Sequence, residues 1–317
     1  MSTARRRLAT KPLDPVRTSR RSPPNSGRRL TQHKGRWLFL LPSFLLLGGF
    51  VVVPLMLGII LAFFQWNGLG SATFVGLANF VAAISDPKFW HSVAITLWYV
   101  FGTTLGCNVL GLSLALALFT KFRGWKIFRT LFYLSGVMPI VATGITWGLI
   151  FNPGDGLLNA FLGAIGLRQF EGLWLANPHL ALPLIIFVGI WIGVGLPMIL
   201  FSAGLMRISP ALLEAADLDG AFGVKRVWYV ILPLLKPVMI VTTLMLIISS
   251  IQVFATVWVM TGGGPGYATY VLGIYLYNTA FEYNRFGYAN AMSVIVAVVA
   301  GASMMVAMKF ARIAEPG

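Results

Sequence analysis

The sequence predicts an all-α, polytopic membrane protein with six transmembrane helices. Of its 317 residues, 57% are hydrophobic and only 10% are charged, and the mean hydropathy is +0.81. A soluble domain carries about 25% charged residues, so this chain has too few polar side chains to cover a soluble fold. The alternation of period two that is typical of membrane barrel strands is absent. We therefore expect helices, which satisfy their backbone hydrogen bonds internally within a bilayer.

Six uncharged apolar runs define the predicted spans. Each has at least 20 residues, and about 20 residues cross a hydrocarbon core of roughly 30 Å. The runs are Leu38–Phe64, Ser92–Phe119, Thr130–Phe151, Ala181–Leu205, Pro237–Met260 and Ala289–Met308. Together they predict a membrane domain over residues 37–310.

The distribution of lysine and arginine predicts the orientation of these spans. Residues 1–36 hold eleven of the 24 basic residues and are rich in Ser, Thr and Pro, a composition typical of a disordered tail. With this tail in the cytoplasm, 21 basic residues lie inside and 3 outside, which follows the positive-inside rule. Both termini, including a short tail at residues 311–317, are then cytoplasmic. The apolar run after the basic tail favours a topology signal over a nucleic-acid-binding arm, so we expect no nucleic acid partner.

The residues that would support catalysis or ion coupling are missing from the expected places. None of the nine acidic residues lies within a span, whereas proton-coupled pumps usually need ionisable groups at membrane depth. No G-x-x-x-x-G-K-[ST] phosphate loop occurs, and the three histidines form no closely spaced ligand pair. We expect no catalytic residue, metal site or cofactor in this chain, and a driving energy that enters from outside the bilayer.

One connection between spans, residues 207–237, has the pattern of a helix–turn–helix at the cytoplasmic membrane face. Ser209 is a suitable N-cap and Pro210 suits the first helical position. Gly220 supplies a turn. A second amphipathic stretch then runs to Pro233, where proline limits continuation of the helix.

The spacing within this loop is more specific than its helical pattern. Glu214-Ala215-Ala216 is followed by three residues, Gly220, nine residues and Val230-Ile-Leu232-Pro233. This pattern resembles the EAA loop of binding-protein-dependent ABC transporter permeases, with valine at position 230 where isoleucine is usual. The segments Phe74–Phe80, Thr261–Pro265 and Gly287–Ala291 resemble stretches of the maltose-type carbohydrate importers. The resemblance extends over roughly residues 38–310 and leaves out the basic tail.

The resemblance implies a type I ABC importer permease in a bacterial inner membrane. In that family, a second homologous permease completes the pathway through the lipid bilayer. Two cytoplasmic ATPase subunits bind ATP and Mg, and an extracytoplasmic solute-binding protein delivers a sugar or oligosaccharide. Carried over to this sequence, the residues that couple the permease to the ATPase are Glu214, Ala215, Ala216, Asp219, Gly220, Leu232 and Pro233.

Neutral polar and aromatic residues within the spans are the candidates for contact with the sugar, because amides bind hydroxyls and aromatic rings pack on sugar faces. The candidates are Asn108, Trp147, Gln252 and Asn290. Hydrogen bonding between helices would explain each of them equally well. Import of a glycerophosphodiester or a polyol is an alternative function, and a secondary carrier or channel is an alternative of a different class.

Overall fold

The computed structural model describes residues 36–120 and 122–313, so the predicted tail at residues 1–36 lies outside the described part except for Arg36, which begins the first helix. Two short strands and a series of helices make up the described residues. The α-helices are α1 (Arg36–Leu47), α2 (Val53–Leu61), α3 (Ala78–Ile84), α4 (Pro87–Phe119), α5 (Trp125–Leu134), α6 (Ile140–Ile150), α7 (Leu157–Ala164), α8 (Pro178–Gly193), α9 (Gly195–Leu205), α10 (Pro210–Leu218), α11 (Val224–Arg226), α12 (Leu232–Ile251), α13 (Ala255–Thr261), α14 (Leu272–Tyr277) and α15 (Phe286–Ile313). The 3-10 helices are η2 (Ser135–Val137), η3 (Arg168–Phe170) and η4 (Trp174–Ala176), and the π-helical turns are η1 (Gly48–Val52), η5 (Val227–Ile231) and η6 (Asn278–Glu282).

The first predicted span forms as α1, η1 and α2, an apolar helix over Leu40–Leu61. The chain divides after Pro54 into two units, and the second begins at Leu55. Pro54 is the second residue of α2, with Val53 alone between it and the end of the π-helical turn η1. A proline inside an α-helix clashes with the carbonyl four residues earlier, and the wider π turn accommodates the ring without ending the helix.

A two-stranded hairpin and α3 precede the longest helix. β1 (Phe64–Gln65) pairs antiparallel with β2 (Thr73–Phe74). The Asn79 side chain on α3 donates hydrogen bonds to the carbonyls of Ala62 and Phe64, each at 2.9 Å, which holds α3 against the hairpin. α4 then runs for 33 residues from Pro87. This start lies five residues before Ser92, the first residue of the predicted span, because Asp86 caps the helix and Pro87 occupies its first turn.

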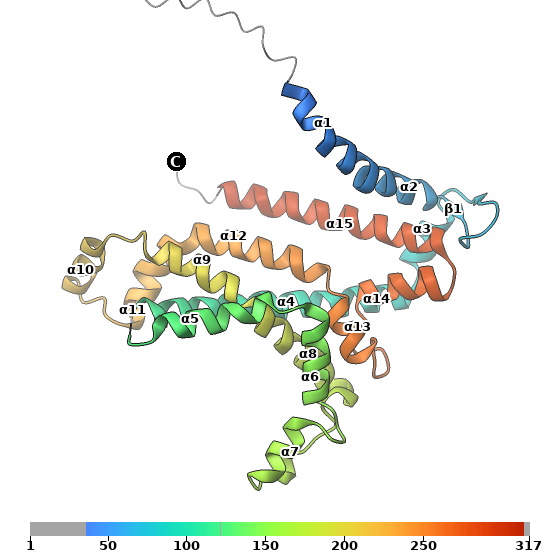
Figure 1. The fold of residues 1–317 in the computed structure, drawn as a ribbon. Coiled ribbons are helices and arrows are strands. Elements are labelled where there is room, and N and C mark those ends of the chain that lie inside the picture. The colour runs from blue at the N-terminus through green and yellow to red at the C-terminus, as the bar shows by residue number, and fades with distance from the viewer. Residues whose placement is uncertain (1–35, 121, 314–317) are drawn as a thin grey trace, which may run out of the picture. The chain divides into compact units, whose positions relative to one another are not determined.

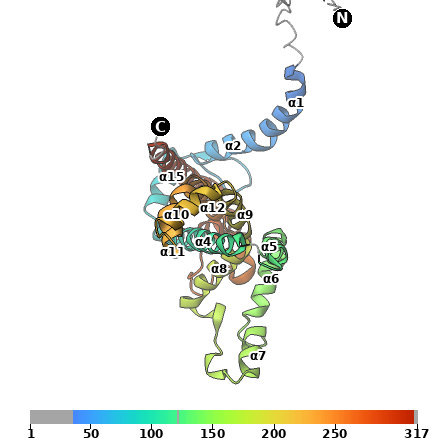
Figure 2. The ribbon, with the colours of Figure 1, turned by 90° about the vertical axis from the view of Figure 1, so that its left-hand side faces the viewer.

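The long helices α4, α9 and α12 pack against one another and form the centre of the second unit (Figures 1 and 2). Small residues on α4 allow the close approach that helix pairs in membranes use. A Cβ atom built at Gly111 would lie 2.8 Å from the Pro197 Cβ and 3.1 Å from the backbone nitrogen of Met198 on α9. We call the end of α4 near β1 and α3 the hairpin end, and the opposite end, near α10, the loop end (Figure 1).

The third predicted span, Thr130–Phe151, is not one straight helix. α5 with η2 and α6 meet at an angle of 101°, and the break falls at Met138 and Pro139. Pro139 has no N–H to continue the ladder, and the residue before a proline is disfavoured in the helical region. Beyond this break, α6 and α7 turn away from the bundle (Figures 1 and 2).

The fifth predicted span, Pro237–Met260, is shifted towards the loop end. The helical segment begins at Val224 and ends at Ile251. The prediction that Pro233 limits the second helix is wrong: the helix passes through Pro233 because the π turn η5 lies immediately before it. Non-helical residues 252–254 then separate α12 from α13.

Three helices of the described part are long and apolar enough to cross a membrane: Leu40–Leu61, Pro87–Phe119 and Val224–Ile251. Three bent helix pairs raise the number to as many as six when each pair counts as one span. The fourth predicted span is divided at Val194 into α8 and α9. The sixth begins at Phe286, and α15 extends to Ile313, so the first residues of the predicted C-terminal tail continue a helix.

Candidate functional site

The loop predicted as a helix–turn–helix begins with α10 at the expected residues. Ser209 has the extended backbone of an N-cap, with φ −61° and ψ 132°, and Pro210 opens the helix. The expected capping bond from the Ser209 side chain is not made. Instead, the Ser209 carbonyl accepts from the N–H groups of Leu212 and Leu213 at 3.1 and 3.4 Å. The helix therefore starts through its backbone and Pro210, without a side-chain cap.

Gly220 ends α10 in the left-handed conformation, with φ +78°. The Ala221 N–H donates to the Ala216 carbonyl at 2.9 Å, and the Gly220 N–H donates to the Asp217 carbonyl at 3.0 Å. This pair of bonds is the Schellman motif, which favours glycine because a Cβ is strained at positive φ. A Cβ at Gly220 would meet no atom within 4 Å. The position therefore requires glycine for its backbone conformation and not for space.

An ion pair fixes α10 against the start of the next helix. The Arg226 guanidinium on α11 donates to the Asp217 carboxylate on α10, and both side chains are partly exposed. Asp217 therefore has its cationic partner within the chain. By contrast, Glu214 and Asp219 are exposed and accept no side-chain hydrogen bond among the described residues, so both carboxylates are free for another molecule.

Large apolar side chains are also exposed in this loop and at the start of the helix that follows it. Leu218 is 90% exposed, Phe222 62% and Tyr229 78%. The two alanines of the motif differ, since Ala215 is exposed whereas Ala216 is buried at 8%. Ala215 can therefore admit the close approach of another backbone, while Ala216 packs within this chain. Leu232 and Pro233 lie in the first turn of α12, directly after η5.

The candidate pathway residue Asn108 connects two helices of the bundle. Its Oδ1 accepts from the Thr242 hydroxyl at 2.9 Å, and its Nδ2 donates to the Thr243 hydroxyl at 3.2 Å. Five residues before Asn108 on α4, the Thr103 hydroxyl donates to the Ser250 hydroxyl on α12 at 3.0 Å. Such bonds are the usual polar contacts between membrane helices. Asn108 therefore has a structural role between α4 and α12.

Trp147 lies in an aromatic cluster between α6 and α8. Its ring centroid is 5.2 Å from that of Phe151, 5.2 Å from that of Phe187 and 5.7 Å from that of Trp191. No hydrogen bond of its indole N–H occurs among the described residues. Of the four candidates, Trp147 is the one that combines a polar atom without a partner and an aromatic surface suited to a sugar face.

Gln252 and Asn290 lie in different surroundings. Gln252 follows the end of α12 and is exposed, with a long 3.4 Å bond to the carbonyl of Ile248. The Asn290 Nδ2 donates to the Phe286 carbonyl at 2.9 Å within α15, and its Oδ1 faces Gly58 of α2. The four candidates thus occupy α4, α6, the end of α12 and α15, each with its own neighbours. The structure does not bring them together as one site.

A polar cluster at the hairpin end was missed by the sequence analysis. Asp86 caps α4 by accepting from the Lys88 N–H at 2.9 Å. Its Oδ2 also accepts from the hydroxyl of Tyr275 on α14 and, at 2.7 Å, from that of Tyr288 on α15. The Asp-Pro pair before an apolar run was a visible capping signal, but nothing local in the sequence indicated the two tyrosines.

The electrostatics of this cluster favour an ionised Asp86. Burial alone would raise the pKa of the carboxyl group. The hydrogen bonds from the Tyr275 and Tyr288 hydroxyls, together with backbone N–H groups of α4, outweigh burial and lower the pKa below its ordinary value of 3.8. Asp86 therefore holds three helices together as a carboxylate. Among the residues that the structure describes, no three His, Cys, Asp or Glu side chains form a group suited to a metal ion.

Known proteins are similar to this chain both in sequence and in fold. Residues 107–317 match the family described as binding-protein-dependent transport system inner membrane component. The chain is 35% identical over 278 residues to the probable ABC transporter permease protein YurN of Bacillus subtilis, with 86% of this chain and 94% of that protein covered. It is 33% identical over 277 residues to the multiple sugar-binding transport system permease protein MsmF of Streptococcus mutans, covering 87% and 94%. A crystal structure of a bacterial alginate ABC transporter in complex with an alginate pentasaccharide-bound periplasmic protein has a chain with a TM-score of 0.77 and 25% identity, covering 89% of this chain and 96% of that one.

Proposed function

Because the chain belongs to the family of binding-protein-dependent transport system inner membrane components, we propose that it is a permease subunit of an ATP-driven importer of a sugar or oligosaccharide. The sugar assignment draws on relatives such as the multiple sugar-binding permease MsmF. In this assignment, a second homologous permease completes the pathway, two ATPase subunits bind ATP and Mg, and a binding protein delivers the solute. This chain itself carries out no catalytic step.

The observation that carries the proposal is the geometry of the loop between α9 and α12. The Schellman turn at Gly220 and the Asp217–Arg226 ion pair fold α10 back onto the start of the Val224–Ile251 helix. The exposed Glu214, Ala215 and Leu218 remain available to a partner. When the ATPase subunits close on ATP, a movement of α10 is transmitted to α12, which packs on both α4 and α9. Alternating access requires such an element with two arrangements, each favoured by different contacts.

The orientation that the Lys and Arg distribution predicts has the loop end in the cytoplasm and the hairpin end outside. Reporter fusions test it directly. A fusion after Gly124, between α4 and α5, should report the cytoplasm, and one after Gly166, after α7, should report the outside. The reverse pattern would exclude this orientation.

The hairpin end and the segments around α7 and α13 are proposed to receive the binding protein. Asp155, in the loop between α6 and α7, is exposed and makes no side-chain hydrogen bond or ion pair among the described residues, so we expect Asp155→Cys to carry a crosslinker without disturbing the fold. It should capture the loaded binding protein in an active assembly. Ser113→Cys, at an exposed position within α4, is the negative control and should give no capture.

The test of the coupling assignment uses Gly220→Val and Glu214→Lys. Valine at φ +78° is strained by about 1–3 kcal/mol, and lysine reverses a charge that has no ion-pair partner among the described residues. Both variants should lose ATPase co-purification or solute-stimulated hydrolysis while the binding protein still binds solute. The matched control is Gly124→Val, because Gly124 also has a positive φ, of +93°, and open space around it, but lies outside α10.

The outcomes also separate the alternatives. Normal assembly, hydrolysis and uptake in both loop variants would refute the coupling role. Uptake that persists in vesicles without ATP would indicate a secondary carrier or channel. ATP-driven uptake of a glycerophosphodiester or polyol, with no sugar competing, would retain the importer and replace its solute.

A further inference from the structure

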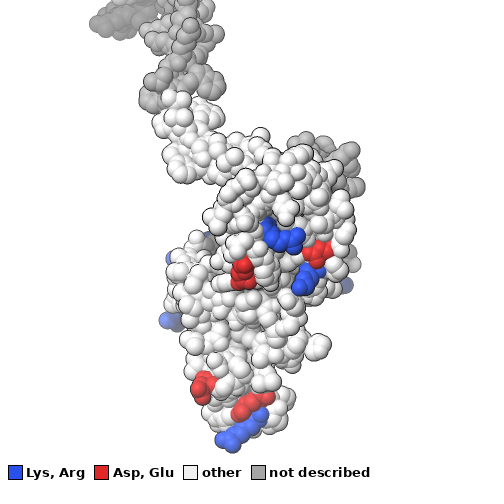
Figure 3. Space-filling view, turned by 90° about the vertical axis from the view of Figure 1, so that its right-hand side faces the viewer, with Lys and Arg blue, Asp and Glu red and all other residues white. Residues whose placement is uncertain are grey.

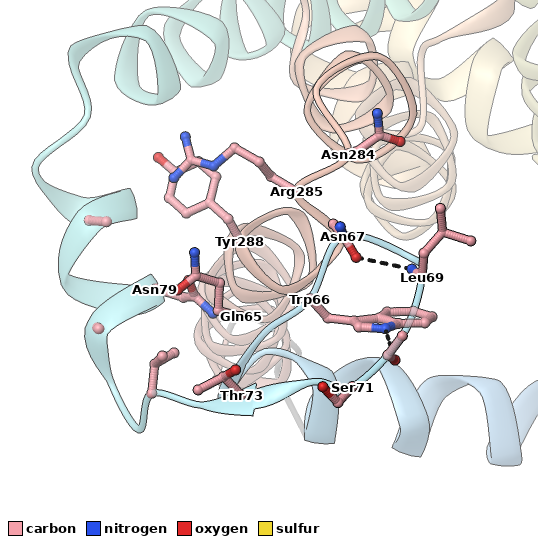
Figure 4. A pocket seen from close by; sticks show the side chains of 14 residues that line it. Gln65, Trp66, Asn67, Leu69, Ser71, Thr73, Asn79, Asn284, Arg285 and Tyr288 are labelled. Atoms are coloured by element: carbon pink, nitrogen blue, oxygen red, sulfur yellow. Dashed lines mark hydrogen bonds between the residues drawn. The ribbon is translucent and has the colours of Figure 1, made fainter.

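The hairpin end contains a polar cavity of about 760 Å³ that shares Tyr288 with the Asp86 cluster but includes neither the α10 loop nor the candidate pathway residues. It lies between the β1–β2 loop, α3 and the start of α15 (Figure 4). Its volume is within the range of roughly 300–1,000 Å³ that is typical of small-molecule sites. The cavity is therefore large enough for a solute of several sugar rings.

Local bonds hold the wall of this cavity in place. The Trp66 indole N–H donates to the Gly70 carbonyl at 3.3 Å, and the Asn67 Oδ1 accepts from the Leu69 N–H at 3.1 Å. On its other side, the Trp66 ring contacts the ring of Phe286 with centroids 5.6 Å apart. The loop is thus shaped by its own residues before any ligand arrives.

The polar groups that face the cavity are mostly without partners. The side-chain amides of Gln65 and Asn284 make no hydrogen bond within the described part of the chain. The Arg285 guanidinium lies over the Tyr288 ring at 4.4 Å and has no carboxylate partner among the described residues. Arg285 is also the one charged residue of the cavity wall. Figure 3 shows how sparse charged side chains are on the face that includes this end of the molecule.

We propose that this cavity binds a carbohydrate on the outer side of the membrane, before the solute enters the pathway; the proposal rests on the proposed function. Amides offer donors and acceptors together, as paired sugar hydroxyls do. The indole of Trp66 offers an aromatic surface of the kind that packs on a sugar face. Arg285 adds a forked donor for two hydroxyls or for the carboxylate of an acidic sugar.

This lining suits a sugar better than the other possible occupants. A phosphate-bearing lipid headgroup would favour several cations, and the wall has one. A charged protein segment would need opposite charges to replace its water, and the wall has no acidic residue. A neutral ligand rich in hydroxyls brings no charge of its own into the cavity, and its hydroxyls can accept hydrogen bonds from the Arg285 guanidinium.

The experiment uses the assembled transporter without its binding protein. Ser71 lines the cavity and is exposed, while the one cysteine of the sequence, Cys107, is buried. Ser71→Cys therefore offers a single accessible thiol for a maleimide. Ser85→Cys is the matched control, because Ser85 is exposed near the same end but does not line the cavity.

Three candidate probes, maltotriose, raffinose and a trigalacturonate, are first tested for ATP-driven uptake by the complete transporter. The sugar that is taken up serves as the probe in the labelling experiment. We expect it to slow labelling of Ser71→Cys at least threefold and to leave Ser85→Cys unchanged. Adding Gln65→Ala or Arg285→Ala to Ser71→Cys should abolish this protection. Unaltered labelling with a transported sugar would refute the cavity site while the importer function stands. Labelling is compared only without the binding protein, because that protein is itself proposed to dock at the hairpin end and would shield Ser71 with or without sugar. Uptake of none of the probes, or of any other sugar, would instead refute the proposed function.

Discussion

Replacing Asp86 with alanine removes the one side chain that joins the starts of α4, α14 and α15. The carboxylate accepts two tyrosine hydroxyls, from Tyr275 and Tyr288, and the Lys88 N–H at the helix cap. Both tyrosines are buried, at 6% and 5% exposure. Their hydroxyls lose their carboxylate acceptor in the variant, and we therefore expect it to lose stability at the hairpin end.

The magnitude follows from the number and kind of bonds. A hydrogen bond to a charged group contributes about 1.5–3 kcal/mol, and loss of an N-cap side chain costs about 0.5–2 kcal/mol. Such contributions do not add fully, because the three donors share one carboxylate. We expect Asp86→Ala to lower the free energy of unfolding by about 3 kcal/mol. Asp86→Asn can keep the cap through its oxygen, so its loss should be about 2 kcal/mol.

Equilibrium unfolding in mixed detergent micelles measures both variants. Asp155→Ala is the control, because Asp155 is exposed and without a hydrogen bond of its side chain in the described residues. Tyr275→Phe should cost little more in the Asp86→Ala background, since its bond is already lost there. A loss below about 0.5 kcal/mol in Asp86→Ala, or fully additive losses in the double variant, would refute the assigned cluster.

The same cluster predicts a dependence on pH. The pKa of Asp86 lies below its ordinary value of 3.8 in the folded protein. A group with a lowered pKa contributes its full stability above the unfolded value and loses it as the pH falls through the folded value. The difference between wild type and Asp86→Asn should therefore be constant above about pH 5 and shrink below pH 4. A difference that grows on acidification would contradict an ionised Asp86.

Two further variants test the packing of α4. Asn108→Ala should lower the free energy of unfolding by about 1 kcal/mol, because hydrogen bonds between membrane helices average about 0.6 kcal/mol each. Ser113→Ala is the control, because the Ser113 hydroxyl bonds only to its own helix. An altered solute preference in Asn108→Ala would show that Asn108 belongs to the transport pathway. Gly111→Leu should lower the free energy of unfolding by about 1–3 kcal/mol, because its Cβ would lie 3.1 Å from the backbone nitrogen of Met198 on α9. Gly148→Leu should be tolerated, because a Cβ at Gly148 meets no atom within 4 Å. Equal losses of stability in the two variants would contradict the close α4–α9 contact.

Much of the fold could be predicted from composition and spacing alone. The apolar runs located the long helices, while Ser209 and Pro210 predicted the start of α10 and Gly220 the turn after it. These features depend on residues close together in the sequence, namely hydropathy, a proline at the helix start and a glycine at positive φ. Local signals of this kind carry their physical reason within a single turn of helix.

The features that could not be predicted depend on partners distant in the sequence. Prolines illustrate the difference: Pro139 breaks its span by 101°, whereas Pro183 and Pro237 lie inside helices. Each ring removes the same N–H, so the surrounding packing decides the outcome. The interhelical role of Asn108 likewise required Thr242 and Thr243, more than 130 residues away.

The π-helical turn before Pro233 is a local feature that also bears on how α10 and α12 are connected. The π turn η5 holds one residue more than an α-helical turn, and it relieves the clash of the Pro233 ring with the carbonyl four residues earlier. Deleting the exposed Tyr229 removes the extra residue. It should cost about 3 kcal/mol, the usual cost of a proline in a helix interior, and Pro233→Ala in the same chain should recover most of this loss. Uptake should stay low even then, because one residue turns α10 by about 100° relative to α12. Equal instability of the deletion with and without Pro233→Ala would show that η5 does not serve the proline, and full uptake in the stabilised double variant would show that the register between α10 and α12 does not matter for coupling.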